Sequence, residues 1–336
     1  MNLSAVLNGN DIDVSWSATT PAPDLYKLSC NGAVVTSTTG LTYTEPGPWP
    51  DTYIYAVRAK FGPLGYTHSS NTDTVTIVGG VTRDMVLFEE GTSINCGYCP
   101  YAAKGIDSLI TVNHKEAVAI AYHPDSQWGS FADNYSNPSS VSRLIYYQMT
   151  GFPSITADGK WRINGVTSPY GRQYSSVYLP FYNDRINAAS FHNLDLVVTP
   201  TGTDTYTATI TAEETFSAFS SVKLHVALTE SDIAVSWGGL TDIDFVCRGM
   251  FPDANGTTVD FSSQSTQNFD INFSTAGFVK EKCQLVVFIQ DPVTKLVTQT
   301  AKYDMSAAIG MDEINGNSIS LYPNPATDYI IANTSG

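Results

Sequence analysis

The sequence predicts a multidomain protein in which one α/β domain stands between two all-β domains. From residue 1 to about residue 79, short runs alternate apolar and polar residues between turn signals, a pattern typical of strands with one buried face. Between residues 81 and 190, strand-like runs alternate with helical patterns, as expected of an α/β domain. From residue 191 to about residue 310, the alternating strand pattern returns. At 336 residues, the chain is long enough for two or three domains.

The first all-β segment, residues 1–79, is predicted to be a small β-sandwich. Its longest strand pattern is Thr52–Ala59, and Gly79-Gly80 is expected to be a linker to the next domain. The segment resembles a fibronectin type III module, which implies that fold for it. The positions that carry this resemblance are Trp16, Tyr53, Tyr55 and Val57.

The second all-β segment, residues 191–310, is predicted to be another β-sandwich. Two of its cysteines, Cys247 and Cys283, lie in strand-like runs where buried thiols are common, although a bridge between them stays open. The clearest strand patterns of this segment are Asn193–Thr199, Thr205–Ala212, Ser221–Thr229 and Leu285–Gln290.

Charge and composition narrow the classes of partner. The formal net charge is −15, which argues against nucleic acid or an anionic membrane surface as a partner. Only 15% of residues are charged, which suits an extracellular β-rich protein. No run approaches the roughly 18 consecutive apolar residues of a membrane helix. Residues 1–4 lack the features of a signal peptide, so we expect a mature fragment at the cell surface or outside the cell. The oligomeric state stays open.

The motif around which the α/β segment is organised is Cys96-Gly97-Tyr98-Cys99. It follows the apolar run of residues 85–90 and precedes a helical pattern from Tyr98 to Val112. Unpaired N–H groups and the positive end of the macrodipole at a helix start favour a thiolate over a thiol. A cysteine in that position can be reactive near neutral pH. Strand, C-x-x-C motif and helix together therefore favour a redox-active dithiol.

Other interpretations of this motif are less well supported. Zinc would need two further Cys or His ligands, and the sequence has no second C-x-x-C, so we expect no metal. Covalent haem attachment would need His where Pro100 stands, and no other cofactor motif is found. A purely structural disulfide between Cys96 and Cys99 stays open.

Three local matches give residues 81–190 a resemblance to the thioredoxin family. The first is the C-x-x-C motif after an apolar strand, and the second is Gly151-Phe152-Pro153-Ser154-Ile155, which resembles the cis-proline loop of that family. The third is Glu90, six residues before Cys96, where thioredoxins carry a buried acid. The sequence departs from the family at Asn95, where an aromatic residue is usual.

The resemblance implies a role for each matched residue. Cys96 would be the exposed nucleophile and Cys99 the buried resolving thiol. Glu90 would accept the proton of Cys99, although a solvated carboxylate at a strand end is an alternative. Two further positions, Phe152 and Tyr98, are expected to contact the substrate, and Pro153 would hold the backbone of Phe152 beside the disulfide. The five histidines are expected to be surface residues: His68, His114, His123, His192 and His225.

The end of the chain carries a second family resemblance. Leu321-Tyr322-Pro323-Asn324-Pro325-Ala326 resembles the opening of the C-terminal sorting domain of type IX-secreted proteins, so residues 317–336 are expected to begin such a domain. Together with Glu89-Glu90-Gly91-Thr92 before the dithiol, this tail resembles the Omp28-related family of Bacteroidetes surface proteins. That family implies an outer-membrane or secreted location more than an activity.

Two hypotheses of function follow. In the first, the protein is a secreted thiol-disulfide oxidoreductase whose substrate is a protein disulfide or dithiol. In the second, it is a surface protein that binds a ligand through its β-domains, and the Cys96–Cys99 pair only staples the start of a helix.

Overall fold

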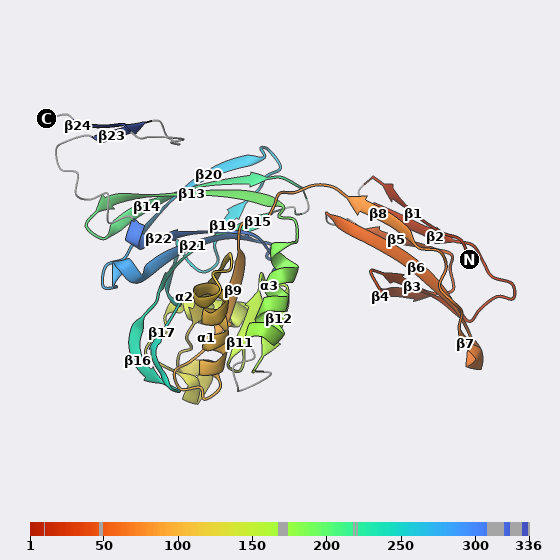
Figure 1. The fold of residues 1–336 in the computed structure, drawn as a ribbon, viewed down its shortest axis with the longest axis horizontal. Coiled ribbons are helices and arrows are strands. Elements are labelled where there is room, and N and C mark those ends of the chain that lie inside the picture. Colours follow the sequence, from red (N-terminus) through yellow and green to blue (C-terminus); the bar gives the residue numbers. More distant parts are fainter. Residues whose placement is uncertain are drawn as a thin grey trace. The chain divides into compact units, whose positions relative to one another are not determined.

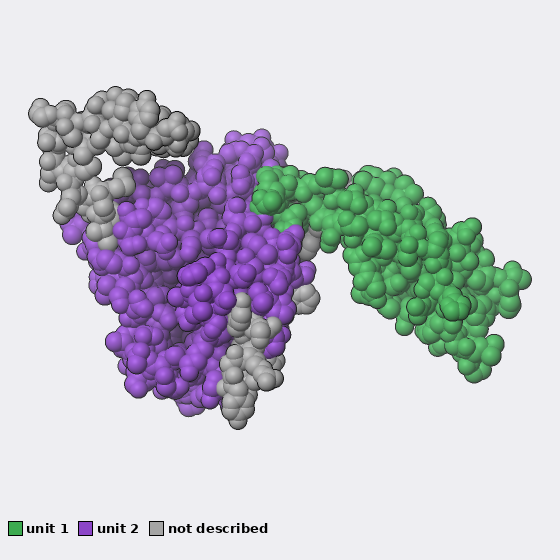
Figure 2. Space-filling view, in the orientation of Figure 1, with its two compact units in different colours: residues 1–82, 188–191, 215–218 green, residues 83–187, 192–214, 219–336 purple. Residues whose placement is uncertain are grey.

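The computed structural model describes residues 1–9, 11–46, 50–166, 174–217, 219, 221–307, 319–322 and 331–334. The chain forms two compact units, which Figure 2 colours separately. Unit 1 comprises residues 1–82, 188–191 and 215–218, and unit 2 comprises the remainder. Strands predominate over helices in both units (Figure 1), which confirms the prediction of a β-rich multidomain protein.

Unit 1 is built from two antiparallel sheets that share one apolar core. Strands β1, β2 and β5 form the first sheet in that order, and β4, β3, β6 and β7 form the second, with β8 paired to β6. Alternate residues of each strand point inward, so that Val14 from one sheet and Val57 from the other meet in the same core. The strands are β1 (Leu3–Asn8), β2 (Asp11–Trp16), β3 (Leu25–Cys30), β4 (Ala33–Thr38), β5 (Thr42–Pro46), β6 (Asp51–Phe61), β7 (Gly65–Tyr66) and β8 (Asp73–Ile77).

Unit 2 is organised around one large sheet with the strand order β12-β11-β9-β10-β18-β15-β21-β22, and β19 pairs with β15. Residues 81–190 and residues 191–310, which the sequence analysis assigns to separate domains, both contribute strands to it. The two groups meet where β10 runs parallel to β18 at Ala121 and Val246. The strands are β9 (Val86–Gly91), β10 (Ala117–Tyr122), β11 (Ser154–Ala157), β12 (Trp161–Asn164), β15 (Val222–Glu230), β18 (Val246–Phe251), β19 (Thr257–Val259), β21 (Cys283–Gln290) and β22 (Val297–Asp304).

Three smaller sheets complete the strand inventory. An antiparallel sheet of order β13-β14-β20 shares an apolar core with β15 and β21. A two-stranded hairpin, β16–β17, projects beside the helices (Figure 1). The expected start of a sorting domain at 317–336 lies mostly outside the described residues, apart from the pairing of β23 with β24. These strands are β13 (His192–Gly202), β14 (Thr205–Glu214), β16 (Ile233–Trp237), β17 (Leu240–Ile243), β20 (Thr266–Ser274), β23 (Ile319–Tyr322) and β24 (Ile331–Thr334).

The helices of unit 2 cover both faces of the β9–β10 region. Helices α1 and α3 share one core with Phe88 and Ala119, whereas α2 shares another with Leu87 and Val118. Neighbouring residues of a strand point to opposite faces of the sheet. Because helices cover both faces here, β9 and β10 are apolar through most of their length. The helical segments of the chain are η1 (Gly62–Leu64), α1 (Cys99–Asp107), η2 (Ser108–Val112), η3 (Ser126–Phe131), α2 (Pro138–Tyr146), η4 (Tyr174–Tyr178), α3 (Leu179–Ile186) and η5 (Lys280–Lys282).

Local sequence signals explain where α1 and α2 begin. Pro100 occupies the first turn of α1, where the missing N–H of proline leaves no hydrogen bond unmade. Asn137 caps α2, because its side chain accepts the N–H of Ser140 at 3.0 Å. The predicted helix from Tyr98 to Val112 is continuous, but its last part, η2, is a π-helical turn.

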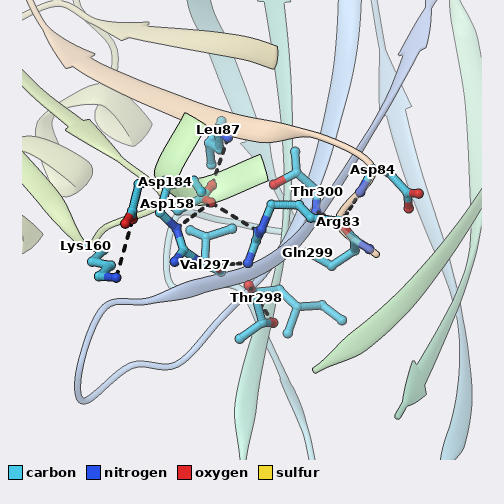
Figure 3. Close-up of polar contacts among 12 residues, drawn as sticks. Arg83, Asp84, Leu87, Asp158, Lys160, Asp184, Val297, Thr298, Gln299 and Thr300 are labelled. Atoms are coloured by element: carbon cyan, nitrogen blue, oxygen red, sulfur yellow. Dashed lines mark hydrogen bonds and ion pairs between the residues drawn. The ribbon is translucent and has the colours of Figure 1, made fainter. Parts of the chain in front are cut away.

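A buried ionic cluster ties the ends of several elements together (Figure 3). Asp158, in the turn between β11 and β12, accepts the N–H of Leu87 at 2.9 Å and forms ion pairs with Arg83 and Arg185, each at 3.1 Å. Arg83 also donates to the carbonyl of Val297 at 3.3 Å. The next residue, Gly159, has a φ of 66°, and a Cβ there would lie 1.8 Å from a backbone oxygen. The turn at Asp158-Gly159 is therefore held both by its ion pairs and by the lack of room for a side chain at Gly159.

Candidate functional site

The two cysteines of the C-x-x-C motif form a disulfide at the point where strand β9 passes into helix α1. Their Cα atoms are 5.5 Å apart, and Cys99 is the first residue of the helix. The remaining thiols, of Cys30, Cys247 and Cys283, are free, so the bridge between the last two that the sequence left open is not formed. Burial raises the pKa of the Cys247 thiol to about 12, which keeps it protonated and unreactive.

The sulfur of Cys96 accepts a backbone hydrogen bond from the start of helix α1. The N–H of Cys99 points at this sulfur with an N···Sγ distance of 3.2 Å. The N-cap residue, Tyr98, makes no side-chain cap to the helix. The Cys96 sulfur therefore satisfies one of the helix N–H groups that a capping side chain would otherwise satisfy. After reduction, the same N–H group and the helix dipole would favour a thiolate at Cys96.

The exposure of the motif differs from the expectation. Cys96, predicted to be exposed, has only 3% of its surface accessible, and Cys99 is fully buried as expected. Tyr98, between them, is 61% exposed. Cys96 is buried in the same apolar core as Cys99. That core also contains Phe152 and Trp237, and Ile94 and Phe131 pack against it.

Hairpin β16–β17 contributes Trp237 to that core, and no pattern in the sequence predicts this contribution. Its turn contains Gly238, where a Cβ would lie 2.3 Å from the side chain of Pro100. The turn therefore packs directly on the residue that follows the C-x-x-C motif. The hairpin comes from the segment that the sequence analysis assigned to the second sandwich. Its position beside α1 depends on the tertiary path of the chain in unit 2. The spacing of apolar residues along the sequence does not predict it.

The loop that leads from β9 to Cys96 is anchored by backbone and side-chain hydrogen bonds. Ser93 Oγ donates to the carbonyl of Phe131 at 2.6 Å, and Asn95 Nδ2 donates to the carbonyl of Ala132 at 2.6 Å. The N–H of Ile94 donates to Asp133 Oδ2 at 3.1 Å. Asn95, which departs from the thioredoxin pattern, therefore holds the loop in place in this protein.

His123 is buried, which corrects the expectation of a surface histidine. It follows β10, and its Nδ1 lies 2.7 Å from Asp133 Oδ2, with both side chains inaccessible to solvent. His192 and His225 are also buried rather than exposed, and burial lowers the pKa of both. His68 and His114 are exposed, as expected. No local pattern predicts this burial, because the same residues can flank a buried histidine and an exposed one.

Glu90 is a buried acid, as the thioredoxin resemblance implies, and the alternative of a solvated carboxylate is wrong. Only 4% of its surface is accessible, and burial raises its pKa to about 8, opposed by the nearby Thr92 hydroxyl. Its Oε1 has no hydrogen-bond partner in the described part of the chain. Glu90 therefore carries its proton at neutral pH. It lines a cavity of about 190 Å³ that includes neither cysteine in its lining.

The preceding residue, Glu89, has a different environment that the sequence did not reveal. Its carboxylate forms a buried ion pair with Arg143 and accepts hydrogen bonds from the hydroxyls of Tyr122 and Tyr147. Gln290, from β21, donates to the Tyr147 hydroxyl at 2.7 Å and accepts from Arg143 at 3.0 Å. Because adjacent strand residues face opposite sides, Glu89 is paired with Arg143 while Glu90 has no such partner among the described residues.

The loop at Pro153 lies at the same end of the sheet as the dithiol. Ser154, the first residue of β11, pairs with Gly91, the last residue of β9. The peptide bond between Phe152 and Pro153 is cis, as the resemblance implies. The ring of Phe152 packs edge-on against Phe131, with 5.4 Å between ring centroids. Strand pairing thus brings the Pro153 loop and the dithiol loop together although about 50 residues separate them in sequence.

The described residues contain no group of three or more His, Cys, Asp or Glu side chains arranged to hold a metal ion. Among the same residues, no helix is both long enough and apolar enough to cross a membrane.

Comparisons with known proteins bear on the fold. No family model and no curated protein matches the chain. Among solved structures, it is similar to HBP35 of Porphyromonas gingivalis, with a TM-score of 0.54 and 16% identity over 76% of this chain and 86% of that one. A protein of Agrobacterium tumefaciens gives a TM-score of 0.43 at 14% identity, covering 65% of this chain and 92% of that one. A domain of the outer membrane lipoprotein Omp28 from P. gingivalis gives 0.27 at 17% identity, covering 34% and 88%. These two scores are too low to support an argument. The chain is therefore similar in fold to HBP35.

Proposed function

We propose that the chain is a surface-exposed or secreted protein with a thioredoxin-like region, and that this region exchanges thiols and disulfides through Cys96 and Cys99. The strand order β10-β9-β11-β12 supports the proposal. Strands β9 and β10 are parallel, and β11 is antiparallel to both β9 and β12. Helices α1 and α3 cover one face and α2 covers the other. This is the arrangement that the resemblance to thioredoxins implies for a strand, a dithiol and a following helix.

The observation that carries the proposal is the hydrogen bond from the Cys99 N–H to Cys96 Sγ. In the exchange, a substrate thiolate attacks Cys96 Sγ, the Cys96–Cys99 bond breaks, and Cys99 leaves as a thiolate. A second substrate thiol then attacks the mixed disulfide, which releases the substrate as a disulfide and leaves Cys96 as a thiolate. Two electrons pass from the substrate to the protein, and the reverse sequence reduces a substrate disulfide. Backbone stabilisation of the Cys96 thiolate makes it the better leaving group in the second step.

Glu90 is suited to supply the proton that this reaction requires. A carboxyl group with a pKa of about 8 is protonated at neutral pH and can give its proton to a more basic thiolate. We assign that role to Glu90 toward Cys99. The exposed Tyr98 would contact an extended substrate segment, and Phe152 and Pro153, which are buried, would support that segment's contact region from beneath.

A surface location and a relation to the Omp28-related proteins belong to the same proposal. They are supported by the Leu321-Tyr322-Pro323 motif and by the likeness of fold to HBP35.

A trapping experiment tests the exchange. The Cys99→Ser variant should form a stable mixed disulfide with a protein substrate that carries a disulfide, because the Cys96 thiolate attacks that bond and no second thiol displaces the substrate, and Cys96→Ser should form none. The wild-type protein should also reduce insulin in the presence of dithiothreitol faster than Cys96→Ser does. If neither variant is trapped and insulin reduction is equal in both proteins, the exchange proposal is wrong.

One observation favours the second candidate function, a binding protein in which the disulfide is structural. Cys96 is only 3% exposed, and the turn at Gly238 packs on Pro100. A disulfide under such cover reacts slowly with large substrates. In that case the oxidised protein should resist millimolar dithiothreitol under native conditions and lose stability once it is reduced in denaturant.

A further inference from the structure

A cavity separate from the disulfide lies between helix α1, the ends of β9 and β10, and the hairpin β16–β17. Its volume is about 190 Å³. The walls are mixed in character, and their apolar part includes Ile106 from α1 and Ile243 and Phe245 from the hairpin and the residues after it. We call it the α1 cavity. A space of this size holds several water molecules or one small organic molecule.

Four buried polar side chains line the α1 cavity and have atoms without a hydrogen-bond partner in the described part of the chain. These atoms are Glu90 Oε1, Thr92 Oγ1, His123 Nε2 and Trp237 Nε1. The four residues have 4%, 3%, 0% and 5% of their surface accessible, respectively. Buried polar atoms are nearly always paired, and an unpaired one costs about 1–3 kcal/mol. Four of them around one cavity indicate that something polar belongs inside it.

These side chains differ in what they can offer a ligand. His123 Nδ1 lies 2.7 Å from an oxygen of Asp133, so Nδ1 is the ring nitrogen engaged by that pair and Nε2 is the one left without a partner. The indole N–H of Trp237 is a donor only. The Glu90 carboxyl can donate when protonated and accept when ionised, and the Thr92 hydroxyl can do both. The lining therefore includes groups that can accept from an N–H group and one that can only donate to an oxygen.

The rim of the α1 cavity is acidic. Burial raises the pKa of the Asp244 carboxyl, and so do the charges of three neighbouring carboxylates, which shows that the four groups lie close together. Those neighbours are Asp107, Asp232 and Asp242. Lys104 is the cation among the lining residues, and Lys282 pairs with Asp232 at 3.4 Å. The balance of charge at the entrance favours a positively charged ligand.

We propose that the α1 cavity binds a small organic amine that also carries a hydroxyl or carbonyl oxygen. The ammonium group would donate to Glu90 and to His123 Nε2, and the oxygen would accept from the Trp237 N–H. The apolar part of the walls would contact the carbon chain between the two groups. The described residues show no arrangement for a metal ion at this site, which directs the choice toward an organic cation.

Binding of an ammonium group at Glu90 would release a proton. Burial raises the pKa of the Glu90 carboxyl, which keeps it protonated without a ligand. The positive charge of the ligand would lower the pKa of Glu90, so its proton would pass to solvent on binding. Glu90 shares the lining of the cavity with His123, Lys104 and the rim carboxylates, and its charge helps to raise the pKa of Tyr178 in η4, which burial raises most. Affinity should therefore rise as the pH increases toward 8, where Glu90 loses its proton without help from the ligand.

Titration calorimetry with three matched compounds tests the proposal. The compounds are 5-amino-1-pentanol, 1,5-pentanediol and 5-hydroxypentanoate, which differ only in the group at one end. The amine should bind at least about tenfold more tightly than the diol, and the carboxylate should not bind. Titration in two buffers of different ionisation enthalpy should show proton release for the amine near neutral pH.

Variants then locate the binding. Glu90→Gln, which preserves the shape of the neutral acid, should remove the proton release and lower the amine affinity by about tenfold. Trp237→Phe should lower the affinity for the amino alcohol but not for pentylamine, which has no oxygen to accept the N–H. Asp195→Asn, an exposed change on β13 outside the cavity lining, should alter neither quantity.

Three results of these titrations would contradict amine binding in the α1 cavity. Equal affinity for the amine and the diol, or an unchanged affinity in Glu90→Gln, would overturn the proposal. Failure of all three compounds to bind would show that the cavity holds water only, which would also overturn it. The proposal does not depend on thiol exchange, because Cys96→Ser should keep the full amine affinity even if the exchange reaction fails.

Discussion

The carboxylate of Asp133 accepts a hydrogen bond from the backbone N–H of Ile94, two residues before Cys96, with an N···O distance of 3.1 Å. The same oxygen lies 2.7 Å from His123 Nδ1. One buried carboxylate from the connection between β10 and α2 therefore fixes both the loop that carries the dithiol and the imidazole at the α1 cavity.

The Asp133→Asn variant should lose stability and loosen the dithiol loop. The amide can still accept one hydrogen bond, but it removes the charge that holds the buried His123 N–H, which we expect to lower the free energy of unfolding by about 2 kcal/mol. Urea unfolding at pH 7 measures the change. The disulfide should also be reduced faster by dithiothreitol than in the wild type. The exposed variant Asp195→Asn is the control, and equal stability of the two variants would refute the assigned role of Asp133.

The stability of the protein should fall as the pH rises from about 4.5 to about 8 because of Glu90. Its pKa is about 8 in the folded protein, compared with an ordinary value of 4.5. The folded state thus holds a proton that the unfolded state has lost throughout this pH range, so deprotonation favours unfolding. The full effect amounts to as much as about 5 kcal/mol, lost progressively across the range.

Glu90→Gln should remove this contribution, because the amide cannot ionise. The variant's unfolding free energy should fall less steeply between pH 5 and pH 8 than that of the wild type, as measured by urea titrations at several pH values. Parallel curves for the two proteins would mean that Glu90 is ionised in the folded state. The Asp195→Asn variant should follow the wild-type curve.

The Gly238→Ala variant should uncover the disulfide. The added Cβ would lie 2.3 Å from the side chain of Pro100, so the hairpin turn must move away from helix α1. We expect reduction of the disulfide by dithiothreitol to become several times faster. We also expect the free energy of unfolding to fall by about 1–2 kcal/mol beyond the effect of the backbone change.

Gly239→Ala is the matched control for that variant. Gly239 also has a positive φ, of 85°, but a Cβ there would meet nothing within 4 Å. Both substitutions therefore strain the backbone, and only one displaces the hairpin from Pro100. Equal reduction rates in the two variants would show that the hairpin does not limit access to the disulfide.

The Cys96 thiol of the Cys99→Ala variant should have a pKa below the ordinary value of about 8.5. The backbone N–H of residue 99 remains in place in this variant and still donates to the sulfur, whereas burial of Cys96 acts in the opposite direction. Thiolate absorbance as a function of pH gives the value. A pKa above 8.5 would mean that burial outweighs the helix start, and it would favour a structural disulfide.

The part of the site that could be predicted from sequence depends on local signals. The strand before Cys96, the helix after Cys99 and the turn at Asp158-Gly159 follow from apolar spacing, from Pro100 and from the demand of the turn for glycine. The burial of Glu90 was reached through the resemblance to thioredoxins. Each of these depends on residues close together in the chain or on a short motif.

The parts that escaped prediction depend on long-range packing. A period of two identifies a strand but does not say which strand lies beside it, so the pairing of β10 with β18 was not foreseen. The hairpin over Pro100 and the partner of Glu89 on helix α2 come from distant segments for the same reason. The burial of His123 is not predictable in this way, because its partner Asp133 lies in a connection that has no regular pattern of apolar residues.

Residues 81–190 and 191–310 share one sheet, which determines which fragments of this chain can fold. A fragment that stops at residue 190 would lose β18, β15, β21 and β22 and would leave β10 with an open edge. The side chains of Val286, Phe288 and Val297, which complete the core around the two cysteines, would be missing as well. Such a fragment would expose apolar surface next to unpaired backbone, the combination that leads to aggregation. The smallest stretch that can be expressed with an intact dithiol therefore extends through the end of β22.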